Sequence, residues 1–482
     1  MGDDMKNKSI WSCYLNSNDI KEIDKDECVD IVIIGGGITG LSIAYSYLND
    51  NYKVCLLEKN TIGSGITSKS TAKITYLQDG IYGKISKLRS DNDAKLYYES
   101  QKEAIDRILK IIDMNHIDCD LKKSDSYLFT IEGNTKTIIK EEKLLTSFGC
   151  KIDNIDVLPD GLKVKRGIKC EDTYTFNPIK YLNGLKEIIK DKIPIYENSC
   201  VKKIIKKEEY YLVKTNNHTI KAKYVILCTH YPYFLFPYLM PLKCSLEKSY
   251  IALFKDNSNI NFQGITCDNQ TLSIRYVEDK YKLLLINSTN LAYSQNDVAN
   301  FKNFINNKPE FVWSNIDIIT KDYLPYIGEI DENLYIATGY NTWGMTNSML
   351  ASLIIHDLID DENNKYSKLV DPKRKDNIII SIKYPLYLIN NMYSFLNSKI
   401  IKNKNWYSNH VRFEKINGID VGIYMDDYGE EHKVINKCPH LGCSLIFNEI
   451  ELTWDCPCHG SRFDLSGNSI EGPSNYNITY KG

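Results

Sequence analysis

A glycine-rich turn between two apolar segments constrains the fold of this chain more than any other feature. Residues 30–34, DIVII, are typical of a short buried strand, and the turn GGGITG follows directly, before a segment with helical periodicity. A second apolar run, VCLLE, ends at Glu58. In such a βαβ unit Gly35 permits the tight turn, Gly37 lets the backbone approach a pyrophosphate, and Gly40 lets the helix pack against the strand. With Glu58 as a ribose acceptor, the pattern predicts a dinucleotide-binding fold.

Three further segments, in order along the chain, resemble the FAD-dependent oxidoreductases of the D-amino-acid oxidase superfamily. They are GSGITSKSTAKIT at 63–75, KAKYVILCTHYP at 221–232, and 324–359, which contains LPYIG and ATGYNTWGMTNS. The sequence holds no second GxGxxG, so we expect one dinucleotide, FAD. Beyond the glycine turn and Glu58, the resemblance implies cofactor contacts by Ile38, Thr39, Lys59, Thr71, Ala72, Val201, Thr229, Gly339, Gly344, Met345 and Thr346. Val201 is expected to hold the adenine through its backbone.

Cysteine and histidine gather in two short motifs near the end of the sequence. CPHLGC at 438–443 offers a thiolate and an imidazole two residues apart, and CPCHGS at 456–461 offers the same pair three residues apart. A [2Fe–2S] centre with two cysteines on one iron and two histidines on the other requires this donor set. Zinc sites usually group like ligands in each half, so zinc fits the mixed pairs less well. We therefore assign the cluster ligands as Cys438, His440, Cys456 and His459.

Both motifs match the pattern of Rieske domains, and this resemblance implies further roles. Cys443 and Cys458 are expected to form a disulfide that ties the two ligand loops together. Ser461 has the position of a hydroxyl that hydrogen-bonds a cluster sulfur and favours the reduced form. Phe463 stands where high-potential relatives carry a tyrosine that hydrogen-bonds a ligand sulfur. Because that donor is missing, we predict a reduction potential in the middle or lower part of the Rieske range.

The order of the motifs predicts the architecture. We expect an α/β Rossmann-type FAD-binding domain with an interleaved α+β substrate domain, followed by a small all-β Rieske domain. At 482 residues the chain is long enough for two or three domains. The expected boundaries are 28–80, 150–230 and 312–362 for the discontinuous FAD-binding domain, 81–149 and 231–311 for the substrate domain, 363–404 for a partly helical linker, and 405–482 for the Rieske domain.

Two redox centres in one chain indicate a change in the number of electrons moved at once. A flavin accepts a hydride, which carries two electrons, whereas a Rieske centre accepts one electron at a time. The superfamily resemblance implies oxidation of a C–N bond in an amine or amino acid. A second route for the electrons favours a dehydrogenase that delivers them to an unidentified one-electron acceptor, over an O₂-consuming oxidase.

Two other functions also fit the sequence, and a third fits it poorly. A redox sensor or electron-transfer module would bind both groups without turning over a small molecule, and in another alternative the cluster only stabilises the fold. A Rieske-type oxygenase would need a mononuclear iron on two histidines and a carboxylate. The six histidines outside the cluster motifs show no close pair with that spacing; they are His116, His218, His230, His356, His410 and His432.

Few residues stand out as candidates for contact with the substrate. Arg275, in SIRYVEDKYKLLLI, has the chemistry to clamp a carboxylate, although an ordinary strand-face arginine fits equally well. Tyr250, Tyr340 and Trp343 are candidates for the pocket wall. His230 fits a structural loop histidine better than a base. The sequence identifies no catalytic acid or base.

Composition limits the partners and the location. With 60 basic and 62 acidic residues, the chain has no bulk attraction to nucleic acid. The first residues lack the apolar segment of a signal peptide, and ten cysteines lie scattered, which favours free thiols in a reducing cytoplasm. The apolar stretch 378–401 is broken by Lys383 and Pro385, so no transmembrane segment is expected. Its helical spacing after Pro385 predicts a helix docked on the protein, or else a peripheral membrane or partner contact.

Overall fold

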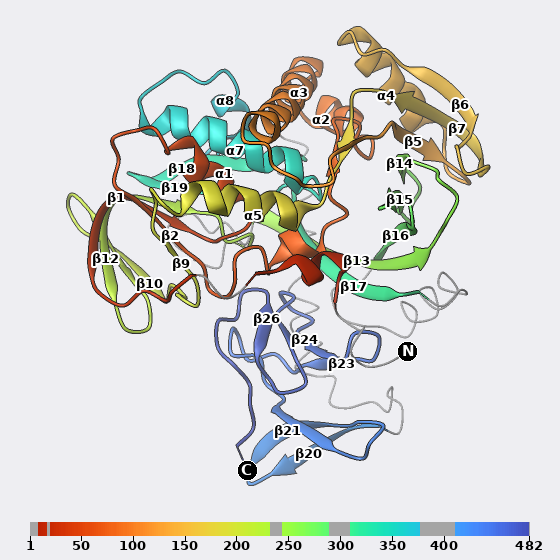
Figure 1. The fold of residues 1–482 in the computed structure, drawn as a ribbon. Coiled ribbons are helices and arrows are strands. Elements are labelled where there is room, and N and C mark those ends of the chain that lie inside the picture. Colours follow the sequence, from red (N-terminus) through yellow and green to blue (C-terminus); the bar gives the residue numbers. More distant parts are fainter. Residues whose placement is uncertain (1–7, 17–19, 232–242, 289–308, 376–409, 482) are drawn as a thin grey trace.

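The glycine turn follows the central strand of a mixed β-sheet in the computed structural model (Figure 1). The structure describes residues 8–16, 20–231, 243–288, 309–375 and 410–481. The helix expected after Pro385, and with it most of the linker expected at 363–404, lies outside the described residues.

The first sheet has the strand order β10-β11-β12-β1-β2-β9, with β19 paired to β12 and β18 paired to β19. Strands β12, β1, β2 and β9 pair in parallel, and so do β12 and β19, as a βαβ motif requires. The β10–β11–β12 meander is antiparallel. The bounds are β1 Glu27–Ile34, β2 Val54–Leu57, β9 Ile195–Tyr196, β10 Lys203–Lys206, β11 Tyr211–Lys214, β12 Thr219–Leu227, β18 Tyr326–Asp331 and β19 Leu334–Thr338.

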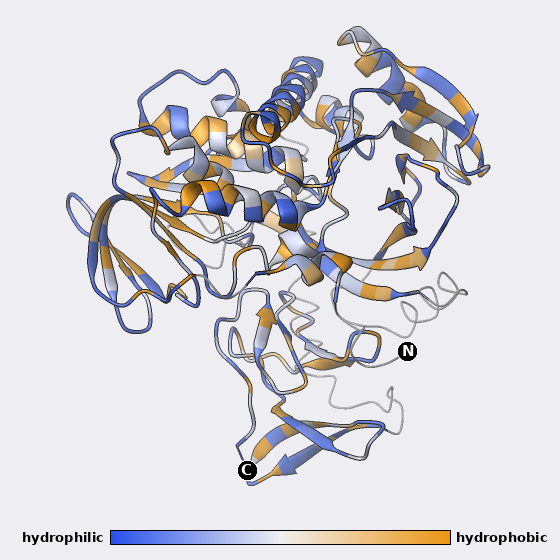
Figure 2. Cartoon of the chain, viewed as in Figure 1, coloured by the Kyte–Doolittle hydropathy of each residue, from blue (hydrophilic) through white to orange (hydrophobic). Residues whose placement is uncertain are grey.

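Helices cover one face of this sheet. Ile31 and Ile33 of β1 belong to the core beneath the helices, and Val32 and Ile34 belong to the core on the other face. Figure 2 shows hydrophobic residues along these strands and in α7, and hydrophilic residues over much of α3. The helices are α1 Ile38–Ser46, α2 Ile81–Leu88, α3 Asp91–Met114, α4 Lys136–Ser147, α5 Pro178–Ile189, α7 Gly344–Ile359 and α8 Ser367–Val370, with 3-10 turns at Ile10–Tyr14 and Ile66–Lys69.

A second sheet stands beside the first, with the order β17-β13-β16-β15-β14-β5-β7-β6. Its bounds are β5 Ser126–Thr130, β6 Asp153–Val157, β7 Lys163–Cys170, β13 Cys244–Lys255, β14 Gln263–Thr266, β15 Leu272–Val277, β16 Tyr281–Ser288 and β17 Phe311–Thr320. A third, small sheet has the order β3-β8-β4, with bounds β3 Lys73–Ile74, β8 Tyr174–Thr175 and β4 Lys122–Lys123.

Near residues 150 and 312, the strands belong to a different sheet from the one that the expected domain boundaries imply. The expected FAD-binding domain includes 153–170 and 312–320, but β7 pairs with β5, and β17 pairs with β13 along its whole length. Because backbone hydrogen bonds hold these strands in the second sheet, both segments belong to that sheet and not to the sheet that carries the glycine turn.

The C-terminal part consists of two small antiparallel sheets around Trp454, Phe447 and Val434. The rings of Phe447 and Trp454 lie 4.8 Å apart, edge to face. Figure 1 shows this part below β13 and β17. Its strands are β20 Val411–Ile416, β21 Ile419–Met425, β22 Glu431–Ile435, β23 Ile446–Asn448, β24 Thr453–Asp455, β25 Arg462–Phe463 and β26 Ser469–Glu471.

A buried network of charges joins the C-terminal part to the second sheet. Lys248 of β13 lies 2.8 Å from Asp455, and Arg462 lies 2.8 Å from Glu451. Ser314 of β17 donates to Glu451 from both its backbone nitrogen and its hydroxyl, at 2.7 and 2.6 Å. All four charged side chains are at most 1% exposed. No helix among the described residues is long and apolar enough to cross a membrane.

Candidate active site

The glycine turn is packed as a dinucleotide cradle requires. Gly35 has φ +113°, and a Cβ there would lie 2.5 Å from the Cys228 carbonyl oxygen. A Cβ on Gly40 would lie 1.9 Å from the Gly35 oxygen, so only glycine lets α1 start this close to β1. Glu58 is oriented by two backbone N–H groups, which donate to its carboxylate from Gly36 at 2.7 Å and from Asn60 at 2.8 Å. The turn and acid therefore fit a ribose and pyrophosphate.

The cradle opens into a cavity of about 420 Å³. The expected cofactor residues that line it are Gly35, Gly37, Ile38, Thr39, Glu58, Lys59, Thr71, Ala72, Val201, Thr229, Gly339, Gly344 and Met345. Two expected residues do not line it. Gly40 lies behind the turn, and Thr346 is buried, with its hydroxyl donating to Gln101 at 2.5 Å. The lining residues come from distant parts of the sequence, because β1, β2, β12 and the start of α7 all contribute to it.

Hydrogen bonds hold the segment 339–343, which leads into α7, against the cavity. The Asn341 side-chain oxygen accepts from the backbone N–H of Thr320 at 2.8 Å, and Gly339 has φ +71°. Tyr340 lines the cavity, as expected for a pocket-wall residue, and its hydroxyl lies 3.2 Å from that of Thr39. Trp343 also lines the cavity and donates from its indole nitrogen to Asp79 at 3.1 Å.

Two substrate candidates from the sequence lie elsewhere. Arg275 is buried outside the cavity lining and donates to the backbone carbonyls of Thr71, Ala72 and Phe176 at 2.5 to 2.8 Å. Since those carbonyls occupy its guanidinium, it holds the 71–72 turn in shape instead of clamping a carboxylate. Tyr250 is also absent from the cavity lining, because it points to the opposite face of β13, in a small core with Ile286 and Val312.

The wall of the cavity formed by β13 and β17 is polar, and the sequence analysis missed it. Glu247 and Ser249 of β13 and Asn315 and Asp317 of β17 all line the cavity. Each pair is spaced by two residues, which places both members on one face of a strand. The alternation of polar residues in LEKSYIAL and WSNIDIIT was the available signal. It did not reveal that one face of these strands lines the cavity while the other contacts the C-terminal part.

Two lysines in the cavity already have partners. Lys73 donates to the Gly264 carbonyl oxygen at 2.7 Å and to the Ser273 hydroxyl at 2.6 Å, and burial lowers its pKa to about 7. Lys84 pairs with Asp79 at 2.7 Å. The pKa of Asp79 lies below its usual value because of Lys84, in spite of burial. Neither lysine is therefore a ready partner for an incoming anion.

The four predicted cluster ligands lie together in two loops. The thiols of Cys438 and Cys456 interact directly, which lowers the pKa of Cys438 to about 7. The imidazoles of His440 and His459 lie 5.0 Å apart, and the Nδ1 atom of each is buried without a hydrogen-bond partner. Burial also lowers the pKa of both histidines. Two neutral, unpartnered imidazole nitrogens beside two thiols fit a [2Fe–2S] cluster.

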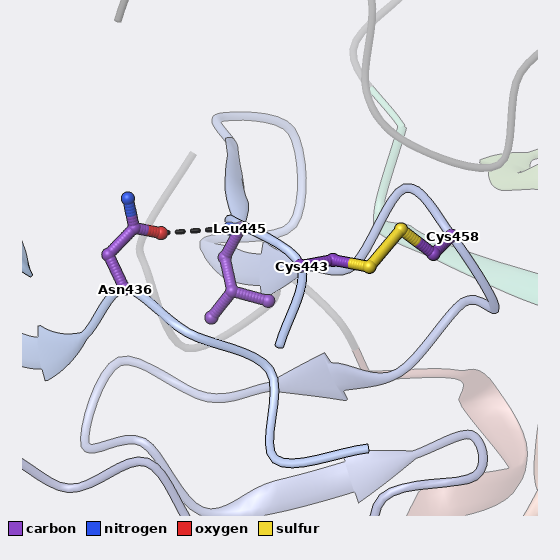
Figure 3. Close-up of a disulfide and its surroundings, with 4 residues drawn as sticks. All are labelled: Asn436, Cys443, Leu445 and Cys458. Carbon is purple, nitrogen blue, oxygen red and sulfur yellow. Dashed lines mark hydrogen bonds between the residues drawn. A yellow bond between two sulfur atoms is a disulfide. The ribbon is translucent and has the colours of Figure 1, made fainter. Parts of the chain in front are cut away.

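The remaining residues of the motifs surround these ligands. Cys443 and Cys458 form a disulfide between the two loops, and Asn436 accepts from the backbone N–H of Leu445 at 2.8 Å beside it (Figure 3). The Ser461 hydroxyl interacts with the Cys438 sulfur. Phe463 is fully buried in the domain core.

The ligand loop of the C-terminal part touches the wall of the cavity. A Cβ on Gly460, next to His459, would lie 2.8 Å from Cδ1 of Ile316 on β17. The Ile316 carbonyl oxygen lies 2.8 Å from Nε2 of His230, which lines the cavity. Glu471 of β26 also lines the cavity and pairs with Lys69 at 2.9 Å. One strand, β17, thus separates the loop that carries His459 from the cavity.

A flavin-type cradle and a Cys₂His₂ cluster site on adjoining parts define an FAD-dependent oxidoreductase with a C-terminal Rieske domain. The family model for FAD-dependent oxidoreductases (DAO) matches residues 30–358, and that for the Rieske [2Fe–2S] domain matches residues 398–480. The chain belongs to the DAO family of FAD-dependent oxidoreductases and carries a Rieske domain. Its cofactors are accordingly FAD and a [2Fe–2S] cluster.

Known proteins share the architecture in whole or in part. The chain is 31% identical to the Bacillus subtilis Rieske 2Fe–2S iron–sulfur protein YhfW over 97% of this chain and 96% of that protein. It is 21% identical to gamma-glutamylputrescine oxidoreductase of Escherichia coli, over 70% of this chain and 85% of that one. Glycine oxidase from Geobacillus kaustophilus superposes with a TM-score of 0.59 at 16% identity, over 73% of this chain and 100% of that one, which shows a shared fold.

Proposed function

We propose that this enzyme is a dehydrogenase that oxidises a C–N bond of an amine or amino acid and delivers the electrons, through its Rieske domain, to a one-electron acceptor. The substrate loses a hydride from carbon and a proton from nitrogen, and water then hydrolyses the resulting imine. FAD supplies a two-electron acceptor for the hydride, and the cluster supplies a one-electron carrier. The names of the similar proteins support a nitrogen-containing substrate.

The observation that carries this proposal is the contact between the cluster-ligand loop and the cavity wall. Ile316 touches Gly460 with its side chain and His230 with its carbonyl oxygen. Because a carbonyl oxygen can only accept, Nε2 of His230 carries the proton, and burial lowers the pKa of this imidazole, which keeps it neutral. The apolar side chains of Ile316 and Leu246 both come within 4 Å of the position that a Cβ on Gly460 would take.

Anaerobic reduction of the holoenzyme tests the proposal. A panel of amines and of D- and L-amino acids would be mixed with the protein while flavin absorbance and the EPR signal of the reduced cluster are recorded together. We expect one compound to bleach the flavin and the cluster signal to grow afterwards. Bleaching of the flavin while the cluster stays oxidised would contradict the electron route. If no compound bleaches the flavin and only redox partners do, the sensor alternative replaces the enzyme.

Removal of the cluster provides the second arm of the test. Cys438→Ser removes one expected ligand, and Cys28→Ser, at an exposed free thiol of β1, is its control. We expect Cys438→Ser to keep substrate-dependent bleaching and to lose reduction of an external one-electron acceptor. Unchanged acceptor reduction would contradict the route through the Rieske domain.

A cytoplasmic location belongs to the same proposal, and it is supported by the ten free cysteines outside the two motifs.

A further inference from the structure

Two carboxylates, one buried and one half-buried, face each other in the wall of the cavity. Glu247 of β13 lies directly opposite Asp317 of β17 in the antiparallel register, and Ser249 lies opposite Asn315. Directly opposed side chains on one face have Cβ atoms about 5 Å apart, and like charges at that separation repel each other. The neighbouring residues Lys248 and Ser314 point the other way, to the Rieske domain. The arrangement therefore exposes a pair of like charges to the cavity alone.

No cation of the described residues forms an ion pair with either carboxylate. The lysines nearest in the cavity are engaged, Lys84 by Asp79 and Lys73 by Gly264 and Ser273. Burial and mutual repulsion raise the pKa of Asp317 to about 7, and burial raises that of Glu247. Without a cation from outside, the pair is therefore held at a cost in charge repulsion and desolvation.

An unpartnered acceptor lies beside the pair. Asn315 is 5% exposed and lines the cavity, and its side-chain oxygen has no hydrogen-bond partner. Its amide hydrogen-bonds the Asp317 carboxylate, so the oxygen is the part of this side chain that remains unpartnered. On the far side of β13, the oxygen of Asn287 on β16 accepts from the backbone N–H of Thr271 at 2.9 Å, and its amide hydrogen-bonds Glu247. Two carboxylates and an amide oxygen without a partner thus line the same wall of the cavity.

An alkylammonium group matches this site. It carries a positive charge and three N–H donors, one for each of the three acceptors. A carboxylate would be repelled by Glu247 and Asp317, and the arginine that could have clamped it, Arg275, lies outside the cavity lining and donates to backbone carbonyls. An α-amino acid would bring a carboxylate next to its ammonium group, so the site selects against that class.

We infer that Glu247, Asp317 and Asn315 bind the ammonium group of the substrate, and that the substrate is an aliphatic amine that lacks an adjacent carboxylate. The oxidation of that amine rests on the proposed function, but its binding does not. The two parts can therefore be tested separately.

Binding is measured on the anaerobic holoenzyme at pH 8 with three four-carbon probes that differ in charge. They are n-butylamine, 1-butanol and butanoate, titrated by calorimetry and by the shift in the flavin spectrum. We expect saturable binding of n-butylamine alone. Glu247→Gln and Asp317→Asn keep the shape and remove the charge, and each is expected to weaken n-butylamine binding about 10- to 100-fold.

The control is Glu310→Gln, at the exposed end of the same strand pair, where Glu310 pairs with Lys255 at 3.1 Å. It should bind n-butylamine as the unmodified enzyme does. Tighter binding of butanoate or of alanine than of n-butylamine would overturn the inference, as would variants that bind n-butylamine normally. If a variant does not fold, the three-probe comparison on the unmodified enzyme still decides. Binding of amines with no flavin reduction by any amine would overturn the proposed function and leave the ammonium site standing.

Discussion

At the scale of single residues, Ser461 and Phe463 follow the cluster ligands Cys456 and His459 closely in the chain, and they differ in what they offer a sulfur. Phe463 offers no donor, and the Ser461 hydroxyl interacts with the Cys438 sulfur. A hydrogen bond to sulfur favours the reduced form because the electron density on sulfur rises on reduction. If it strengthens by about 1–2 kcal/mol, the potential changes by about 40–90 mV.

We therefore expect Phe463→Tyr to raise the reduction potential by about 40–90 mV and Ser461→Ala to lower it by a similar amount. A redox titration followed by EPR measures both. Tyr428→Phe, which removes a hydroxyl from a 93% exposed side chain of the same domain, is the control and should leave the potential unchanged. If the unmodified protein has a reduction potential near the top of the Rieske range, the prediction that Phe463 lowers the potential by lacking a hydroxyl donor is wrong.

The carboxylate pair of the proposed ammonium site also predicts a pH dependence. The folded pKa of Asp317 is raised to about 7, so a proton competes with the amine below that pH. Binding of n-butylamine should be full above pH 7 and fall as the pH drops through 7, by up to tenfold per unit. Asp79 and Glu471 have lowered pKa values and stay ionised over this range. Calorimetric titrations from pH 5.5 to 8.5 measure how n-butylamine binding depends on pH. Asp317→Asn should make this dependence much weaker. An equally steep pH dependence in that variant would mean that another group titrates.

At the scale of elements, strand β17 lies between the cavity and the loop that carries His459, and Gly460 is the point of close approach between that loop and the strand. Gly460 has φ +71°, and a Cβ there would meet Ile316 at 2.8 Å. Gly418, in the β20–β21 turn, has φ +82° with nothing within 4 Å, so it shares the backbone strain without the contact.

Gly460→Ala should displace the loop and slow cluster reduction after the flavin is bleached, while the rate of bleaching itself stays the same. Gly418→Ala carries the same strain of about 1–2 kcal/mol and should leave both rates unchanged. Stopped-flow absorbance at the flavin and cluster bands separates the two steps. Equal effects of both variants would mean that strain, not the contact with β17, controls the rate.

The same elements show what the sequence could predict. The glycine turn and the two ligand motifs were predictable, because a few residues at fixed spacing define the chemistry. The carboxylate wall was not, because Glu247 and Asp317 are 70 residues apart and meet only through the pairing of β13 with β17. Arg275 was ambiguous for the same reason, since its partners at Thr71 and Ala72 lie about 200 residues away in the chain.

At the scale of the whole molecule, a buried charge network joins the Rieske domain to the second sheet. Lys248 faces Asp455 and Glu451, and Arg462 faces Glu451, Asp455 and Glu471. Removal of one member of a buried network leaves an uncompensated charge, at a cost of about 3–5 kcal/mol. Exposed or partly exposed pairs contribute about 0–1 kcal/mol.

Lys248→Met should therefore loosen the attachment of the Rieske domain, whereas Lys282→Met, which removes a partly exposed partner of Asp160, should change little. Hydrogen exchange of β13, β17 and β24 in the holoenzyme measures the loosening, and cluster reduction by the flavin should slow in parallel. The pKa of Asp455 lies well below its usual value because of Lys248 and Arg462, so its contribution to docking is present above about pH 4 and is lost as the pH falls through the folded pKa. Protection of β17 that survives both Lys248→Met and acid would show that apolar contacts such as Ile316 with Gly460 hold the two parts together, and electron transfer should then persist in the variant.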